Sequence, residues 1–174
     1  NILAFEISRR MEMPYTPYCR PVDVVLNGEY RGCYQLCDQV EVNKNRVDIV
    51  EMEPEDIQLP ELTGGYLIEI DSYAWGETSY FVSKKGVPVT IKSPDEDDIV
   101  PEQTKYITDY FNQMEAAIFA ENYDDEEEGY RSFLDLDSFL RYFMLEELCG
   151  NPDTFWSVYL TKNRYSNKFV VGPA

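Results

Sequence analysis

The sequence predicts an α+β fold, with an antiparallel sheet of hairpins and two long helices. Runs rich in β-forming residues fill positions 20–42 and 64–92, and apolar residues recur at helical spacing from residue 101 onward. The chain carries no internal repeat. Strands and helices are thus segregated along the chain rather than alternating, which is typical of α+β rather than parallel α/β domains.

The N-terminal part is expected to form a short helix and then a hairpin. Residues 1–13 place apolar side chains near one helical face, and Pro14 ends this pattern. Two β-rich runs follow and meet at the Asn-Gly pair of residues 27–28, the strongest short signal for a two-residue hairpin turn. Residues 44–63 are charged and contain proline, which favours a loop.

Segments 64–71, 79–84 and 87–92 are expected to be further strands of one sheet. A helix is predicted to begin at Pro101, because proline suits the first helical turn and Glu102 suits its positive end. Its apolar stripe consists of Ile107, Tyr110, Phe111, Met114, Ile118 and Phe119.

A second long helix is expected between residues 135 and 151. Asp137 is its predicted N-cap, and Gly150 lies near its end. Residues 155–172 then indicate a closing hairpin.

The composition excludes several classes of function. A length of 174 residues suits one domain with a real core, and no apolar run is long enough to span a membrane. Fifteen basic residues against 33 acidic ones give a net charge of −18, which argues against nucleic-acid partners and anionic membrane surfaces. Because the chain contains no histidine, Ser-His and Cys-His nucleophile pairs and His-ligated zinc are impossible.

The cysteines indicate free thiols. Cys33 and Cys37 lie four residues apart in a strand-like run, which separates them by about 13 Å when extended and prevents a disulfide. Neither they nor Cys149 belong to a CxxC pair, so buried free thiols are expected. The cysteines indicate neither a reducing nor an oxidising compartment.

Asp153 is the strongest candidate for a catalytic residue. It follows the second long helix, and Pro152 and the aromatic residues Phe155 and Trp156 flank it. A carboxylate at such a junction is typical of a catalytic base or a metal ligand. The alternative is that residues 152–153 only form a tight turn beside core aromatics.

Three charged residues of the predicted sheet are further candidates. Glu69 and Asp71 alternate with isoleucines, so their carboxylates face the same side of one strand and could bind a metal or pair with Lys92. Lys92 ends an apolar strand, from which a lysine can hold phosphate oxygens. The alternative for all three is an exposed, solvated position.

The acidic segment at residues 124–135 suggests a weaker candidate, a calcium loop. Acidic residues and a glycine occupy the EF-hand-like ligand positions 1, 3, 5, 6 and 12, namely Asp124, Glu126, Glu128, Gly129 and Asp135. Glutamates replace the usual shorter ligands, and the last ligand is not the usual glutamate, so a solvated acidic loop is the favoured interpretation.

The order of these segments resembles the spore-coat CotH family of atypical protein kinases. The stretch LNGEYRGCYQL at residues 26–36 and the helix that leads into GNPD at residues 150–153 carry most of the resemblance. GGYLIEID at residues 64–71 and the segments between them extend it over nearly the whole chain.

The resemblance implies a compact relative of the protein-kinase fold that transfers phosphate from ATP, with Mg²⁺ or Mn²⁺, to serines of a protein substrate. It implies that Asp153 is the catalytic aspartate, which accepts or orients the proton of the substrate hydroxyl. Lys92 and Glu69 lie in family-like strands and are the candidates for binding the nucleotide. The implied setting is the spore coat or the extracellular surface or envelope of a bacterium.

The resemblance places the metal-binding aspartate just beyond Ala174. Family sequences continue there with a Trp-Asp-Phe-Asp stretch, whose aspartate binds the metal, and they begin before Asn1 with further strands. Residues 1–174 are therefore expected to be the central portion of one kinase domain, with negligible phosphate transfer on their own. A catalytically dead kinase fold that acts as a scaffold or binding protein in a coat or cell-surface assembly is the alternative function.

Overall fold

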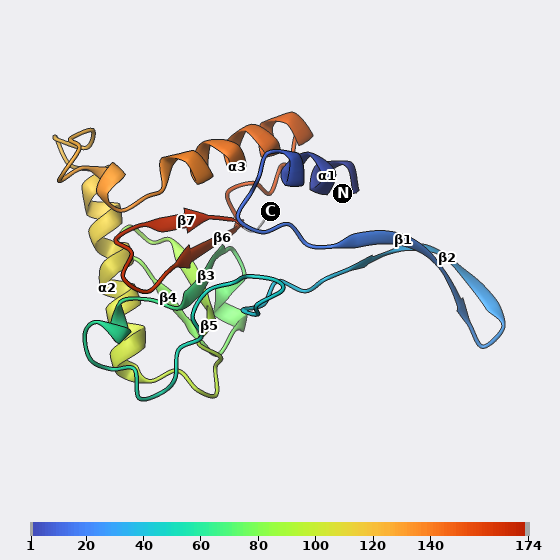
Figure 1. The fold of residues 1–174 in the computed structure, drawn as a ribbon, viewed down its shortest axis with the longest axis horizontal. Helices are drawn as coiled ribbons and strands as arrows, with labels where there is room; N and C mark the ends of the chain where they lie inside the picture. The colour runs from blue at the N-terminus through green and yellow to red at the C-terminus, as the bar shows by residue number, and fades with distance from the viewer. Residues whose placement is uncertain (1, 173–174) are drawn as a thin grey trace.

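The computed structural model describes residues 2–172, and they form the expected α+β fold (Figure 1). A two-stranded hairpin extends from a body built on a five-stranded antiparallel sheet with the order β4-β5-β3-β6-β7. The helices and strands are α1 (Ile2–Arg10), β1 (Cys19–Leu26), β2 (Glu29–Cys37), β3 (Tyr66–Asp71), β4 (Tyr80–Val82), β5 (Pro88–Ser93), α2 (Pro101–Ile118), α3 (Leu136–Cys149), β6 (Ser157–Lys162) and β7 (Phe169–Val171). Within this part of the chain, no helix is long and apolar enough to cross a membrane.

The β1-β2 hairpin turns at the predicted Asn-Gly pair. Asn27 and Gly28 have φ angles of 53° and 82°, the left-handed values that a type I′ turn requires at both central positions. An irregularity between Val24 and Val25 shifts the register, and Gly32 beside it has a φ of 107°. The extra residue in β2 shifts the pairing by one residue for all pairs from Val24–Gly32 to Cys19–Cys37, away from the turn.

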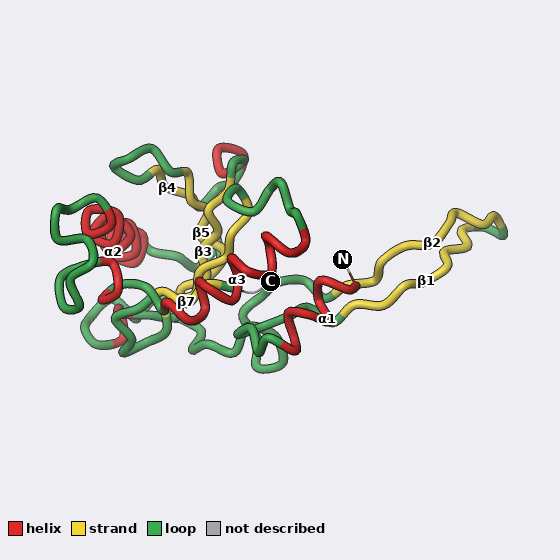
Figure 2. Tube along the Cα trace, turned by 90° about the horizontal axis from the view of Figure 1, so that it is seen from above, coloured by secondary structure: helices red, strands yellow, loops and turns green. Residues whose placement is uncertain are grey.

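The five-stranded sheet has one apolar face and one more polar face. The apolar face packs against α2, as Figure 2 shows from above, and α3 lies beside β7. The core contains Ile68, Val89, Ile91, Phe111, Tyr142, Leu160 and Phe169, among others. Alternation along the strands places the neighbouring residues of β3, β5 and β6 on the opposite face, which carries the candidate site.

Three details of the sequence prediction are wrong. The N-cap of α3 is Asp135 rather than Asp137, because the Asp135 carboxylate accepts the Ser138 N–H at 2.8 Å and its own N–H binds β7. Ile118 and Phe119, the last residues of the predicted apolar stripe, are exposed rather than part of the core, because α2 ends at Ile118. The thiols of Cys33, Cys37 and Cys149 are free but exposed, because the hairpin and the end of α3 are covered by no other element of the described chain.

Lys162 is a fully buried lysine on the apolar face of the sheet. Its ammonium group donates to the backbone carbonyls of Thr63 and Ser166 and lies 4.5 Å from the centre of the Tyr110 ring. Burial lowers the pKa of Lys162 to about 8. The folded chain therefore loses this charge at a lower pH than the unfolded chain.

Between pH 8 and pH 10, the wild-type protein is expected to gain stability relative to the Lys162→Met variant. Because the folded pKa of about 8 lies below the unfolded value, the unfolded state binds more protons in this range and stability rises with pH. The relative gain is about 2 kcal/mol, measured by urea unfolding of both proteins at each pH. Parallel curves for the two proteins would show that Lys162 does not titrate in this window.

Candidate active site

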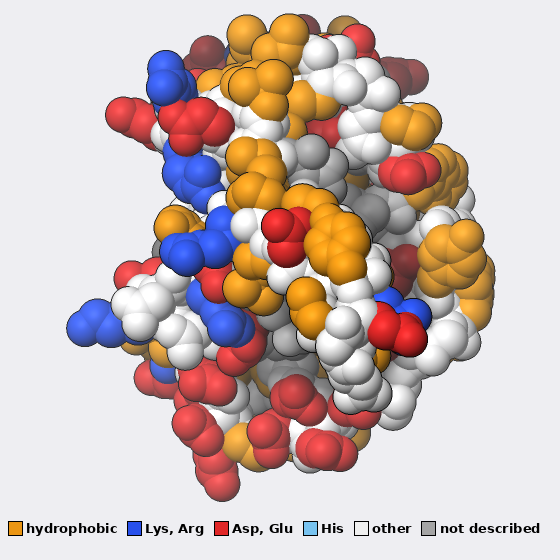
Figure 3. Space-filling view, turned by 90° about the vertical axis from the view of Figure 1, so that its right-hand side faces the viewer, with side chains coloured by type: hydrophobic (Ala, Val, Ile, Leu, Met, Phe, Trp, Pro, Cys, Tyr) orange, Lys and Arg blue, Asp and Glu red, His pale blue; other side chains and the backbone are white. Residues whose placement is uncertain are grey.

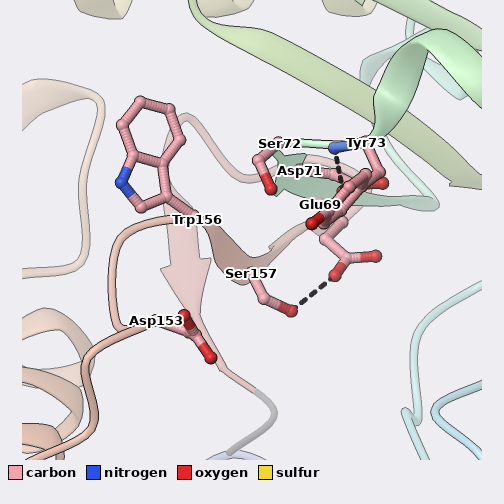
Figure 4. Close-up of a pocket in the computed structure, with 7 residues that line it drawn as sticks. All are labelled: Glu69, Asp71, Ser72, Tyr73, Asp153, Trp156 and Ser157. Carbon is pink, nitrogen blue, oxygen red and sulfur yellow. Dashed lines mark hydrogen bonds between the residues drawn. The ribbon is translucent and has the colours of Figure 1, made fainter.

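The more polar face of the sheet opens into a pocket of about 610 Å³ at the ends of β3 and β6 (Figure 4). Glu69 and Asp71 come from β3, Ser157 begins β6, and Asp153 comes from the loop that follows α3. The lining residues are Glu69, Asp71, Ser72, Tyr73, Asp153, Trp156 and Ser157. Carboxylates from distant parts of the chain thus meet at one cavity.

The two carboxylates of β3 are buried and held by hydrogen bonds. The hydroxyl of Ser157 donates to Glu69 Oε1 at 2.7 Å, as Figure 4 shows. The Asp71 carboxylate accepts the backbone N–H of Tyr73 at 2.7 Å and the hydroxyl of Thr90 at 3.0 Å. Glu69 and Asp71 face the same side of the strand, as their spacing predicts, but they are buried rather than solvated.

Lys92 pairs with Glu69 from the neighbouring strand β5. Its Nζ lies 3.4 Å from Glu69 Oε2 and 3.4 Å from Glu77 Oε1, and 29% of its side chain is exposed. Lys92 is not among the residues that line the pocket. Lys92 thus contacts one oxygen of Glu69, and Ser157 donates to the other.

Asp153 both shapes a turn and lines the pocket. Its backbone N–H donates to Asn151 Oδ1 at 3.1 Å, and its carbonyl accepts the N–H of Trp156 at 2.9 Å. The side chain is exposed at the pocket, and no side-chain hydrogen bond holds its carboxylate in the described structure. The alternative interpretation, in which the neighbouring aromatic residues are core, is wrong, since Phe155 and Trp156 are each 56% exposed. Trp156 lines the pocket beside Asp153.

Strand β6 also contributes to this site, which was not expected from the sequence. Ser157 and Tyr159 alternate with the apolar residues Val158 and Leu160, as Glu69 and Asp71 do with isoleucines in β3. Tyr159 lies opposite Glu69 in the register, and burial, followed by the charge of Glu69, raises its pKa. This alternation of polar and apolar residues is the signal in the sequence that places Ser157 and Tyr159 on the same face as the candidate site.

The lining residues suit a divalent cation together with phosphate. Three carboxylates and no basic side chain line the pocket, so a bare triphosphate would be repelled. Within residues 2–172, no three or more Asp, Glu or Cys side chains gather closely enough to hold a metal alone. Mg²⁺ typically binds through one or two carboxylates plus substrate phosphates and water, which is the arrangement these residues fit.

The metal-binding aspartate expected just beyond Ala174 lies outside the described residues. Ala174 itself is also outside them, because the description ends at Gly172. That expectation therefore stays a prediction. Among the described residues, the pocket offers Glu69 and Asp71 as oxygen donors, which agrees with the expectation from their strand spacing that they could bind a metal.

The acidic segment at residues 124–135 does not have the geometry of a calcium loop. Asp135 would be the last ligand, but its carboxylate caps α3. Asp125, which is not an expected ligand, accepts the backbone N–H groups of Glu127 and Glu128. Residues 124–128 are an exposed acidic loop, and residues 129–135, most of them buried or partly buried, lead from it into α3.

Comparisons with known proteins give one match. The family model described as CotH kinase protein matches residues 1–173 of the chain. No curated protein and no solved structure matches it.

Proposed function

The chain belongs to the CotH kinase family, and on that premise we propose that it transfers the γ-phosphate of ATP to serine side chains of a protein substrate. Membership of this family implies a kinase-type enzyme, and therefore ATP and a divalent metal in general. The observation that carries the proposal is the convergence of Asp153 with Glu69 and Asp71 at one pocket.

Asp153 is the catalytic residue of this proposal. Its carboxylate is exposed at the pocket, so a serine hydroxyl of a substrate can reach it. The carboxylate would orient the hydroxyl toward the phosphate and accept its proton as the new ester bond forms. The turn formed by Asn151 and Trp156 around Asp153 would fix the position from which it acts.

Glu69 and Asp71 would hold Mg²⁺ or Mn²⁺ at the buried end of the pocket. When bound, the metal supplies positive charge that neutralises the phosphate oxygens of ATP. Lys92 holds one oxygen of Glu69 in place through their ion pair, and Ser157 fixes the other oxygen. That residues 1–174 form the central portion of a larger kinase domain, with a further metal ligand beyond Ala174, stays a prediction.

The protein substrate is proposed to present its serine on a basic segment. The chain carries a net charge of −18, which attracts positively charged segments and repels acidic ones. A protein of the spore coat or of the bacterial cell envelope is the proposed partner and setting.

Calorimetry of Mn²⁺·ATP binding to the native protein tests the proposed site, with Glu69→Gln and Glu77→Gln as matched variants. Both glutamates lie 3.4 Å from the Lys92 ammonium, but only Glu69 lines the pocket. We expect Glu69→Gln to weaken binding roughly 10- to 100-fold and Glu77→Gln to change it little. Equal losses in both variants would argue against this site, and no binding by the parent would favour the scaffold.

A further inference from the structure

The register of the β1-β2 hairpin places two cysteines directly opposite each other. Cys19 begins β1, Cys37 ends β2, and the two are paired in the ladder. The pair lies at the base of the hairpin, where both strands leave the body of the protein (Figure 1). The remaining cysteine of the hairpin, Cys33, faces Asp23 instead of another thiol.

The hydrogen-bond pattern makes Cys19 and Cys37 a non-hydrogen-bonded pair. The N–H of Asp38 donates to the carbonyl of Tyr18 at 2.9 Å, so Tyr18 and Asp38 form a hydrogen-bonded pair. Because such pairs alternate along an antiparallel ladder, the next pair, Cys19 and Cys37, is not hydrogen-bonded. Pro21 lies two residues after Cys19 and therefore belongs to the same, non-hydrogen-bonded type of pair. This agrees with its lack of an N–H that could donate to β2. In such a pair the Cα atoms are about 4.5 Å apart, which lies within the range that a disulfide bridges.

Both thiols are placed to react with each other and with solvent. Cys37 is exposed and Cys19 is partly exposed. Partial burial raises the pKa of the Cys37 thiol, and interaction with the Cys19 thiol raises it further. The side chains of paired residues point to the same face of a ladder, so no rearrangement of the backbone is needed to join them.

We propose that Cys19 and Cys37 form a reversible cross-strand disulfide that closes the base of the hairpin. A low-molecular-weight disulfide such as oxidised glutathione is the oxidant. One cysteine thiolate attacks a glutathione sulfur and releases one glutathione thiol. The second thiolate then attacks the cysteine sulfur of the mixed disulfide and releases the other glutathione thiol. Two cysteine thiols become one disulfide, and one oxidised glutathione becomes two reduced molecules.

This bond would act in the two-stranded sheet, which is separate from the five-stranded sheet of the body. An isolated two-stranded hairpin is marginally stable in water. Figure 3 views the molecule from the side of the hairpin, and hydrophobic side chains run through the centre of this face. Several apolar side chains of the hairpin are exposed. These exposed side chains are Val25, Leu26, Tyr30, Tyr34 and Leu36. A covalent link at the base would hold the strands in register and slow their separation.

The test equilibrates the native protein with reduced and oxidised glutathione and identifies disulfides by peptide mapping. We expect one species that joins the peptides of Cys19 and Cys37 and that reverses on reduction. Hydrogen exchange of the hairpin amides should slow at least about fivefold in the oxidised protein, while exchange in the body stays unchanged. The proposal does not depend on the kinase activity.

Two matched variants decide the assignment. Cys33→Ser, on the same strand, should leave both the disulfide and the slowed exchange intact, whereas Cys19→Ser should abolish both. Persistence of thiols at Cys19 and Cys37 under excess oxidant would overturn the proposal. A bridge from Cys37 to Cys33 or to a second molecule would overturn it equally, as would a Cys19–Cys37 disulfide that leaves hairpin exchange unchanged.

Discussion

Replacing Asp153 with asparagine is expected to lower phosphate transfer by the native protein roughly 100- to 10,000-fold, the usual contribution of a general base. Asparagine has the same size as aspartate and leaves the backbone turn unchanged, but its amide cannot accept the hydroxyl proton of the substrate. Because the Asp153 side chain is exposed and makes no side-chain hydrogen bond in the described structure, the fold should be unaffected. The loss should appear in the rate of transfer rather than in ATP affinity.

The measurement is the rate at which labelled phosphate from ATP enters protein in the presence of Mn²⁺. Asp97→Asn is the matched control, since Asp97 is an exposed loop aspartate that is not part of the pocket lining. Its rate should equal that of the parent, and the unfolding midpoints of all three proteins should agree. A well-folded Asp153→Asn variant with the parental rate would exclude the catalytic role of Asp153.

The largest loss of stability is expected from Phe169→Ala, which should destabilise the fold by about 3–5 kcal/mol. Phe169 is fully buried in β7, and its ring lies 5.6 Å from that of Tyr110 and 6.1 Å from that of Phe111. Its backbone also joins β7 to the segment that precedes α3, through hydrogen bonds with Phe133 and Asp135. Removing the ring would leave a cavity where α2 meets the sheet.

Denaturant unfolding with linear extrapolation gives this value, with Tyr165→Ala as the control. Tyr165 is an aromatic residue of the same β6-β7 connection, but it is 71% exposed, so its loss should cost less than about 1 kcal/mol. A similar small cost at Phe169 would show that the α2–β7 contact contributes little to stability.

The parts of the fold and site that follow local rules could be predicted from the sequence. The Asn-Gly turn depends only on two residues that tolerate positive φ. The shared face of Glu69 and Asp71 follows from the alternation of a strand. Asp153 is a candidate from the sequence because it follows a predicted helix end at Gly150 and is flanked by Pro152 and aromatic residues, a signal contained within a few residues. Its place at the pocket agrees with this, and its catalytic role stays a prediction.

The parts that depend on distant contacts could not be predicted. A two-residue turn alone would pair Cys19 with Leu36, and the extra residue near Gly32 is what pairs it with Cys37. Asp135 caps α3 because β7 binds its backbone, and β7 lies more than about 30 residues further along the chain. Burial of Lys162 likewise depends on the carbonyls of Thr63 and Ser166, which a single strand does not reveal.

The central claim is that the pocket formed by β3, β6 and the Asp153 loop binds the metal and the nucleotide. A crystal structure of the native protein with Mn²⁺ and a non-hydrolysable ATP analogue, with the anomalous signal of manganese, tests this most directly. We expect a manganese peak in contact with a carboxylate oxygen of Glu69 or Asp71, and the γ-phosphate facing Asp153. Manganese and nucleotide bound elsewhere, or absent at saturating concentrations, would contradict it.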